Sequence, residues 1–242
     1  MATTAKETKV HDVFESIASR YDRMNGIISF QLHKRWRKDT MKRMAVPMGA
    51  EILDLCCGTG DWAFALNEAV GPTGQVTGVD FSEEMLTVAK EKAQKKQQMQ
   101  IQWQTGNAMA LSFPDEHFDY VTIGFGLRNV ADRQQVLAEI HRVLRPGGKI
   151  VCLETSQPTL IGWRQLFTFY FHHVMPLFGK LFAKSYQEYS WLQESARDFP
   201  DREALKREFQ AAGFDVLQVK SYAGGAAVSY THLRAHETEA DL

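Results

Sequence analysis

The sequence predicts an α/β fold built on a doubly wound, mostly parallel sheet. Between residues 51 and 154, short apolar runs alternate with stretches of helical periodicity, which is the pattern of strands joined by crossover helices. The first run, I-L-D-L, leads into the glycine turn C-C-G-T-G-D and then into helical sequence from Asp61. A strand, a glycine turn and a helix in this order are typical of nucleotide-binding α/β folds.

The composition is that of a soluble globular protein without a strong electrostatic bias. The chain has 242 residues, of which 44% are hydrophobic and 24% are charged, which is enough to bury the core of one domain with additional segments. Its 28 basic and 29 acidic side chains give a formal net charge of −1. A nearly neutral chain gives no reason to expect nucleic acid as a partner, so a small or apolar substrate is favoured.

Cysteine usage and the N-terminus indicate the compartment. The chain has three cysteines, two of them adjacent at Cys56 and Cys57, and these can form neither a disulfide framework nor a zinc site of ordinary spacing. We therefore expect no metal and a reducing cytoplasm. The first residues lack the apolar core of a secretory signal, and no apolar stretch is long enough to span a bilayer. The sequence predicts a protein that does not cross a membrane.

Residues 1–48 are predicted to form an N-terminal helical cap. After a polar start, residues 10–18 have helical periodicity, Asn25-Gly26 indicates a turn, and residues 32–44 form a basic helix that carries His33. A basic helix is also typical of a solvated face over an apolar stripe, and this alternative stays open.

The glycine turn is the predicted cofactor site. Gly58 and Gly60 let the backbone approach a ligand closely, and Asp61 is expected to cap the helix that follows. The spacing D-x-x-x-G-x-G differs from the G-x-G-x-x-G of a dinucleotide site, so no pyrophosphate is expected. Asp54, at the carboxyl end of the strand, suits a ligand with a positive charge, such as the ammonium group of an amino acid. These features favour S-adenosylmethionine over NAD.

The second strand, predicted at residues 75–79, runs directly into Asp80. An acidic residue at this distance from the glycine turn holds a ribose diol in nucleotide-binding α/β folds. The alternative is that Asp80 caps the helix at residues 83–96, although Ser82 alone can do so. Asp80 is therefore the predicted ribose ligand.

The third strand, at residues 101–104, leads into G-N-A-M. A carboxamide at the carboxyl edge of the sheet can donate to a purine nitrogen, so Asn107 and Ala108 are candidates for an adenine pocket. The alternative is a plain turn, because Gly-Asn is common turn chemistry.

The fourth strand, at residues 118–123, ends in the polar tip G-F-G-L-R-N, which faces the ligand crevice of such folds. Arg128 and Asn129 in this tip are predicted to orient a substrate oxygen, with a salt bridge within the loop as the alternative. A helix at residues 133–144 and a fifth strand at 149–154 follow. The connecting R-V-L-R-P-G-G has a structural role, because proline ends the helix and the glycines lead into the strand.

Residues 158–195 interrupt the alternation with an aromatic-rich segment that is predicted to form a helical lid. Its mixture of aromatic and basic residues suits a cover that holds a long apolar substrate and touches the membrane surface. Additional core is the alternative. The adjacent His172 and His173 do not indicate a metal, since neighbouring residues of a helix do not face the same way.

The C-terminal part contains a helix at residues 202–212, a strand at 214–222 and a tail at 228–242. The tail is polar and lacks the alternation of a final strand. We therefore expect residues 228–242 to form an atypical, disordered tail and not a final strand.

Five motifs together resemble the class I S-adenosylmethionine-dependent methyltransferases, a Rossmann-like family: D-L-C-C-G-T-G-D, G-V-D-F-S, G-N-A-M, G-F-G-L-R-N and R-V-L-R-P-G-G. Residues 21–36 resemble the signature of the C-methyltransferases of menaquinone and ubiquinone biosynthesis. Three segments are most similar to the branch of Gram-positive bacteria that acts on demethylmenaquinone: L-E-T-S-Q-P, F-G-K-L-F-A-K-S-Y-Q-E-Y-S-W-L-Q-E-S-A-R-D-F-P and the loop at residues 124–129. The resemblance covers residues 10–227.

The resemblance implies cofactor contacts at Thr59, Asp80, Asn107 and Ala108. Some relatives have a serine contact where this chain has Gly124, which removes one hydroxyl hydrogen bond. Relatives also finish with a short strand of the type G-G-x-A-A-x-H-x-G, which the residues from Val228 onward do not fit. This difference puts the last strand in doubt.

The implied reaction is transfer of a methyl group from S-adenosylmethionine to a ring carbon of a polyprenyl naphthoquinol, demethylmenaquinol. Arg128 is expected to stabilise the quinolate oxygen and Tyr21 and Asn129 to orient it. The base is either His33 or a water relayed by Tyr21 and Arg128.

Two other functions stay open: a benzoquinol methyltransferase of ubiquinone biosynthesis and a protein that binds S-adenosylmethionine without catalysis. An NAD-linked dehydrogenase ranks lower, because the glycine spacing is wrong. We expect a cytoplasmic protein with transient contact at the inner face of the cell membrane. A homodimer is compatible with the sequence.

Overall fold

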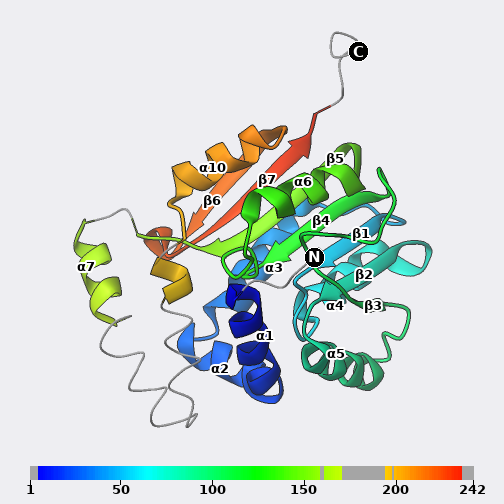
Figure 1. Ribbon diagram of the computed structural model, residues 1–242, viewed down its shortest axis with the longest axis horizontal. Helices are drawn as coiled ribbons and strands as arrows, with labels where there is room; N and C mark the ends of the chain where they lie inside the picture. Colours follow the sequence, from blue (N-terminus) through cyan, green and yellow to red (C-terminus); the bar gives the residue numbers. More distant parts are fainter. Residues whose placement is uncertain (1–4, 159–160, 171–193, 198, 236–242) are drawn as a thin grey trace.

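The computed structural model describes residues 5–158, 161–170, 194–197 and 199–235. Its centre is a seven-stranded sheet in the order β3-β2-β1-β4-β5-β7-β6, with helices on both faces (Figure 1). The neighbours β3-β2-β1-β4-β5 pair in parallel, and β7 pairs antiparallel with both β5 and β6. The strands are β1 (Glu51–Leu55), β2 (Gln75–Asp80), β3 (Gln102–Thr105), β4 (Phe118–Gly124), β5 (Leu144–Thr155), β6 (Phe214–Tyr222) and β7 (Ala227–Arg234).

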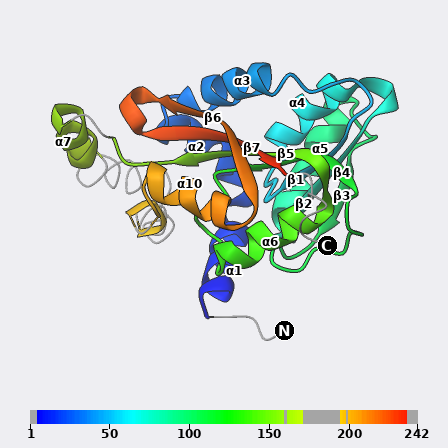
Figure 2. The same ribbon diagram turned by 90° about the horizontal axis from the view of Figure 1, so that it is seen from above.

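The helices form two layers around this sheet (Figure 2). The side chains of β1 pack against both helix layers. Ile52 belongs to the core under one layer, and Leu53 and Leu55 belong to the core under the other. A strand buried on both faces is expected for a parallel sheet covered by helices. The helices are α1 (Ala5–Ile17), α2 (Tyr21–Ile28), α3 (Leu32–Met44), α4 (Asp61–Val70), α5 (Glu83–Lys96), α6 (Arg133–Val143), α7 (Ile161–Phe169) and α10 (Arg202–Ala211).

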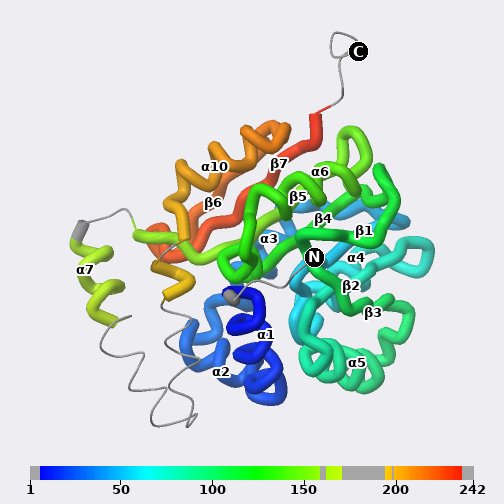
Figure 3. Tube along the Cα trace, viewed as in Figure 1, coloured from blue at the N-terminus to red at the C-terminus, as the bar shows by residue number. Residues whose placement is uncertain are grey.

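The helices α1 and α2 lie at the edge of the sheet where the parallel strands end, whereas α3 lies over one face of the sheet (Figures 2 and 3). Ile17 and Ala18 pack against Met85 of α5 in a small buried cluster of their own. The α1 helix begins at Ala5, earlier than the sequence predicts. The predicted fold class, a doubly wound and mostly parallel sheet, is confirmed.

The predicted turn at Asn25-Gly26 is wrong, since both residues lie inside α2. The chain turns later, where Phe30 and Gln31 adopt positive φ angles of 49° and 62°. A Cβ atom at Gly26 would lie 2.4 Å from the side chain of Gln31. Gly26 therefore allows the side chain of Gln31 to approach the α2 backbone closely, but it does not mark the turn itself.

The fifth strand also differs from the prediction. The α6 helix ends at Val143, and β5 begins at Leu144, so the R-P-G-G segment belongs to the strand. Its pairing with β4 shifts register between Phe118 and Tyr120. The segment still has the structural role that the sequence indicates.

The prediction of a disordered tail is wrong for residues 228–234, because β7 occupies the position between β5 and β6. Val228, Tyr230 and His232 are all buried. The segment lacks the expected alternation because β7 is an inner strand, and an inner strand is covered on both faces. Residues 236–242 lie outside the described residues.

The predicted lid at residues 158–195 is described only in part. Residues 161–170 form α7 and its end, while 171–193, including His172 and His173, lie outside the described residues. The hydroxyl of Tyr170 donates to the carbonyl oxygen of Ile28, 3.0 Å away. The described part of the segment therefore contacts the N-terminal helices.

Candidate active site

The carboxyl group of Asp54 is buried at the end of β1, with 1% of the residue exposed. Because β1 pairs in parallel with β4, Thr122 lies alongside, and its hydroxyl donates to Asp54 Oδ1 over 2.7 Å. Asp54 Oδ2 has no hydrogen-bond partner among the described residues. Burial raises the pKa of Asp54 to about 7. An oxygen that can accept a hydrogen bond from a ligand thus lies at the predicted cofactor site.

The Asp80 carboxylate joins the end of β2 to the glycine turn. The backbone N–H of Gly58 donates to Asp80 Oδ2 over 2.8 Å, and that of Ser82 donates to Oδ1 over 3.0 Å. Burial raises the pKa of Asp80 to about 6. Ser82, and not Asp80, caps α5, because its hydroxyl accepts from the backbone N–H of Met85. The carboxylate of Asp80 keeps further lone pairs for a ligand.

The prediction that Asp61 caps α4 is wrong. The N-cap residue is Gly60, which has a φ of 80°, and Asp61 is the first residue of the helix. A Cβ atom at Gly60 would lie 2.5 Å from the ring of Trp103, so only glycine fits this turn. The Asp61 carboxylate instead pairs with Arg37 at 3.0 Å and with Lys92 at 2.5 Å.

A cavity of about 450 Å³ lies at the carboxyl ends of the central strands. The sheet contributes Gly58 and Asp80, and the loop after β3 contributes Asn107 and Ala108. The α1 helix adds five further lining residues, Glu7, Thr8, Val10, His11 and Phe14. This larger cavity therefore lies between the sheet and the N-terminal helices.

A second cavity of about 120 Å³ adjoins the first. The two share five lining residues, Tyr21, Cys56, Gly58, Gly124 and Phe125. The other lining residues of the smaller cavity include the charged and polar side chains of His33, Arg37, Asp54, Thr59 and Arg128 beside the apolar ones of Ile28, Trp36 and Trp62. Space for a ligand thus continues from the larger cavity past Tyr21 into a smaller cavity that has both aromatic and charged walls.

Arg128 lies in the wall of the smaller cavity and forms a buried ion pair. Its Nη1 atom is 2.8 Å from Glu154 Oε2, and the two side chains are 6% and 0% exposed. Its guanidinium carbon lies 5.8 Å from the centre of the Phe125 ring. The Nε atom has no partner among the residues that the structure describes. The salt-bridge alternative is therefore correct as to pairing, but the partner is on β5 and not in the loop.

Asn129 lies beside Arg128 but lines the larger cavity and not the smaller one. Its side-chain amide donates to the carbonyl oxygen of Phe125 over 3.2 Å. This hydrogen bond joins two residues of the tip that follows β4, four positions apart. The structure thus places the two predicted residues of this tip in different cavities.

Tyr21 and His33 come from α2 and α3. Burial raises the pKa of Tyr21, whereas burial and the nearby Arg37 lower the pKa of His33 to about 4. Ser29 Oγ donates to the carbonyl oxygen of Asn25 over 2.6 Å and also lies 2.5 Å from His33 Nδ1. Since a hydroxyl has one proton, Nδ1 carries the hydrogen in this contact and Nε2 is the acceptor.

Thr59 connects the glycine turn to the N-terminal helices. Its hydroxyl donates to Asp22 Oδ1 over 2.6 Å, and Lys92 Nζ contacts Asp22 Oδ2 at 2.8 Å. Lys92 also pairs with Asp61, so α2, α4 and α5 meet at one ammonium group. Sequence reasoning missed Asp22 and Lys92, because nothing in their local sequence indicates this meeting.

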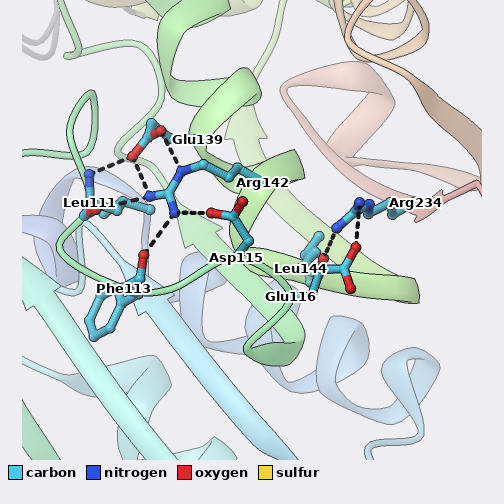
Figure 4. A network of polar contacts seen from close by, with 8 residues as sticks. All are labelled: Leu111, Phe113, Asp115, Glu116, Glu139, Arg142, Leu144 and Arg234. Atoms are coloured by element: carbon cyan, nitrogen blue, oxygen red, sulfur yellow. Dashed lines mark hydrogen bonds and ion pairs between the residues drawn. The ribbon is translucent and has the colours of Figure 1, made fainter.

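The loop that carries Asn107 and Ala108 is fixed from both sides. Asn107 Oδ1 accepts from the backbone N–H of Met109 over 2.9 Å, and Asn107 Nδ2 donates to Glu7 of α1 over 3.2 Å. Further along, Arg142 donates to the carbonyl oxygens of Leu111 and Phe113 and pairs with Asp115 and Glu139 (Figure 4). The Gly-Asn turn of the alternative reading is present, and it also borders the larger cavity.

Most predicted site residues meet around the two cavities. Asp54, Gly58, Thr59, Asp80, Asn107, Ala108, Tyr21, His33, Arg128 and Asn129 line at least one of them, whereas Gly60 lines neither. Glu154 was missed, although its place next to the tip of β4 follows from the parallel pairing of β4 with β5.

A sequence model of the ubiE/COQ5 methyltransferase family matches residues 2–234. The chain belongs to this methyltransferase family. The match includes β7, which the sequence-based resemblance left out. The prediction of an S-adenosylmethionine-dependent methyltransferase is therefore confirmed.

Individual relatives are similar over nearly the whole chain. A demethylmenaquinone methyltransferase of Oceanobacillus iheyensis is 59% identical over 234 residues, which cover 97% of this chain and 98% of the relative. One of Geobacillus stearothermophilus is 60% identical, with 93% and 97% covered. One of Listeria welshimeri is 55% identical, with 97% and 100% covered.

Solved structures of more distant methyltransferases share the fold. An S-adenosylmethionine-dependent methyltransferase of Aquifex aeolicus is 17% identical with a TM-score of 0.62, covering 82% of this chain and 89% of that structure. One of Thermotoga maritima is 20% identical with a TM-score of 0.61, covering 93% and 99%. At these identities the likeness shows the fold alone.

Within the described ranges, no group of three or more His, Cys, Asp or Glu side chains is arranged to hold a metal ion. The same part of the chain has no helix that is both long and apolar enough to cross a membrane.

Proposed function

We propose that this methyltransferase moves the methyl group of S-adenosylmethionine to a ring carbon of demethylmenaquinol. The observation that carries the proposal is the pair of adjoining cavities joined at Tyr21, one bordered by Asp80 and the other by Arg128. Demethylmenaquinone methyltransferases that are 55% to 61% identical over nearly the full length support this acceptor.

The larger cavity takes the adenosine. Asp80 accepts from the ribose hydroxyls with the lone pairs that its two backbone contacts leave over. Asn107 and Ala108 border the adenine. Val10 and Phe14 of α1 cover the cavity from the other side. We assign residues 1–48 the role of a cap, because this cover excludes water from the bound cofactor.

The smaller cavity takes the methionine end and the quinol ring. Asp54 Oδ2, buried and without a partner in the described structure, accepts from the ammonium group. The glycines of the turn, Gly58 and Gly60, allow close backbone approach, and Thr59 lies at the same turn. When bound, the cofactor supplies an electrophilic methyl group on a sulfonium. The protein must therefore align the acceptor and help it to become a quinolate.

Arg128 stabilises the quinolate oxygen with its buried Nε–H, and Tyr21, which borders both cavities, orients the ring. Asn129 borders the cavity assigned to the adenosine, so its expected role towards the quinol is not part of the proposal. A phenolic hydroxyl has a pKa near 10, about six units above that of His33. Direct transfer to His33 is therefore uphill by about 8 kcal/mol. This difference favours a water relayed by Tyr21 and Arg128 over His33 as the acceptor of the proton.

The test is incubation with methyl-labelled S-adenosylmethionine and chemically reduced demethylmenaquinone, followed by mass spectrometry of the lipid phase. Labelled menaquinone is the expected product. A parallel reaction offers the benzoquinol precursor of ubiquinone. Preferential labelling of the benzoquinol would overturn the acceptor, and cofactor binding without transfer to either quinol would overturn the assigned reaction.

We also propose that the protein contacts the surface of a membrane from the cytoplasmic side. Trp163, Leu166 and Phe169 of α7 are 40%, 57% and 57% exposed. The helix extends from one end of the molecule (Figures 1 and 2). Arg164 lies among them and is also exposed. Exposed aromatic and basic side chains on one short helix suit the bilayer interface, where a polyprenyl substrate resides.

A further inference from the structure

The carboxylate of Glu154, at the carboxyl end of β5, holds four donors although it is completely buried. Oε1 accepts from the backbone N–H of Arg128 over 3.2 Å, and Oε2 accepts from Arg128 Nη1 over 2.8 Å. Oε2 also accepts from the backbone N–H and the hydroxyl of Thr155 over 2.9 and 3.4 Å. Because both oxygens only accept, the group fits the ionised form.

Glu154 therefore fixes Arg128 at two points, the backbone and one end of the guanidinium. The ring of Phe125 lies against the guanidinium, 5.8 Å from its central carbon. With Nη1 held by Glu154, the Nε–H is left without a partner in the described structure, in a residue that lines the smaller cavity. The orientation of this donor is set by Glu154.

Stability alone does not account for this arrangement. A buried ion pair contributes little net stability, because desolvation of both charges offsets their attraction. A buried N–H without a partner is also unfavourable. An ion pair that leaves one buried donor unpaired, in a residue that lines a cavity, fits a site that must bind an oxygen.

We propose that Glu154 is a positioning residue that aims the Nε–H of Arg128 at the acceptor oxygen and sets the pKa of that oxygen. The inference rests on the proposed function, in which Arg128 stabilises a quinolate. The carboxylate of Glu154 cancels the charge of Arg128 before the acceptor binds. It therefore also limits how far Arg128 lowers the pKa of the quinol.

The variant Glu154→Gln separates the effect on the orientation of Arg128 from the effect on the pKa of the acceptor oxygen. The amide keeps the size of the side chain and one acceptor but removes the negative charge. We expect turnover above pH 8 to fall roughly 10- to 100-fold as the guanidinium loses its orientation. The acidic limb of the pH–rate profile moves down by about one pH unit, because Arg128 then acts on the quinol without a counter-charge. The Kd for S-adenosylmethionine stays within about twofold.

The matched control is Glu208→Gln. Glu208 forms a two-point pair with Arg133 at 2.8 and 2.9 Å, and neither residue lines either of the two cavities described above. This control should leave turnover and pH profile unchanged. If the two variants lose turnover alike, or if the acidic limb of Glu154→Gln does not move, the proposal is wrong.

A double-mutant cycle with Arg128→Gln tests whether Glu154 acts through Arg128. We expect Glu154→Gln to have no further effect on turnover in the Arg128→Gln background, whereas independent roles would give additive losses. The double variant also lacks the uncompensated buried carboxylate, so it should melt at a higher temperature than Arg128→Gln. Additive losses in turnover would overturn the inference.

Assays of the wild-type protein distinguish failure of the proposed role of Glu154 from failure of the proposed function. Transfer to demethylmenaquinol by the wild type with an unchanged Glu154→Gln variant would overturn only the role of Glu154. A wild type that binds S-adenosylmethionine but methylates neither quinol would overturn the proposed function and this inference with it.

Discussion

At the scale of single residues, we expect the buried carboxyl group of Asp54 to make cofactor affinity depend on pH. Its pKa is raised to about 7 by burial, and an ammonium group is bound by the ionised form only. Below pH 7 the proton must leave before the ligand binds, so the Kd for S-adenosylmethionine should rise by up to about tenfold per pH unit. Calorimetric titrations between pH 8 and 5.5 measure this slope.

The variant Asp54→Asn identifies the group responsible. We expect its affinity at pH 8 to be roughly 10- to 100-fold weaker, because a charged hydrogen bond is lost. It should also lose the step near pH 7 and keep only a weaker one near pH 6 from Asp80, whose pKa is raised to about 6. An unchanged pH dependence in Asp54→Asn would show that Asp54 does not bind the ammonium group.

The variant Arg128→Ala tests the assignment of the acceptor side. Turnover should fall by roughly 100- to 1000-fold, because a donor to the developing oxyanion is lost. The Kd for S-adenosylmethionine should change far less, since Asp54 and Asp80 are retained. Glu154 is then buried without its partner, so the free energy of unfolding should also fall by about 3–5 kcal/mol. Assays at low temperature keep the variant folded, and equal losses in turnover and cofactor affinity would contradict the assignment.

At the scale of elements, β7 makes stability depend on pH through His232. Both ring nitrogens lack a partner within the described chain, and the ring stacks on Phe209 with 4.2 Å between centroids. Burial lowers the pKa of His232 to about 4, below its value in an unfolded chain. Its contribution is therefore complete above about pH 6.5 and is lost as the pH falls towards 4, by roughly 1 kcal/mol per unit.

Urea unfolding at pH 7.5 and pH 5 checks this prediction. The wild type should lose more stability between the two values than His232→Leu, which has no group to protonate. Other acidic groups titrate alike in both proteins, so the difference between the two losses isolates His232. Equal losses would show that the histidine is not the sensitive group of β7.

At the scale of the whole molecule, α7 is the element through which we propose that the protein contacts a membrane surface. We expect the wild type to sediment with anionic phospholipid vesicles and the double variant Trp163→Ser, Phe169→Ser to remain largely in solution, because apolar area is lost from the interface. Activity on a short-chain, water-soluble quinol should be preserved in this variant.

The control for α7 is Leu217→Ser, which changes another exposed apolar side chain, 50% exposed on β6. It should sediment like the wild type. If both variants lose vesicle binding to the same degree, α7 is not the contact, and general surface hydrophobicity explains the association.

Much of the fold follows from the sequence because its elements are specified locally. The predicted bounds of α3, α5 and β6 agree with the structure, since apolar periodicity, the serine cap of α5 and the glycine after α10 act within a few residues. The grouping of Asp54, Gly58 and Gly60 around one strand end was predictable for the same reason, because they stand within seven positions of one another. That Gly60 lines neither cavity was not predictable from this spacing.

Contacts between distant parts of the chain were decided only by the tertiary structure. Glu154 meets Arg128 because β5 pairs with β4, and Asp22 meets Thr59 because α2 lies against the glycine turn. The polar sequence of β7 is a strand only because its neighbours bury it on both faces. Local patterns specify which conformation a segment prefers, whereas partners far apart in sequence are selected by packing of the whole core, which no short window of sequence contains.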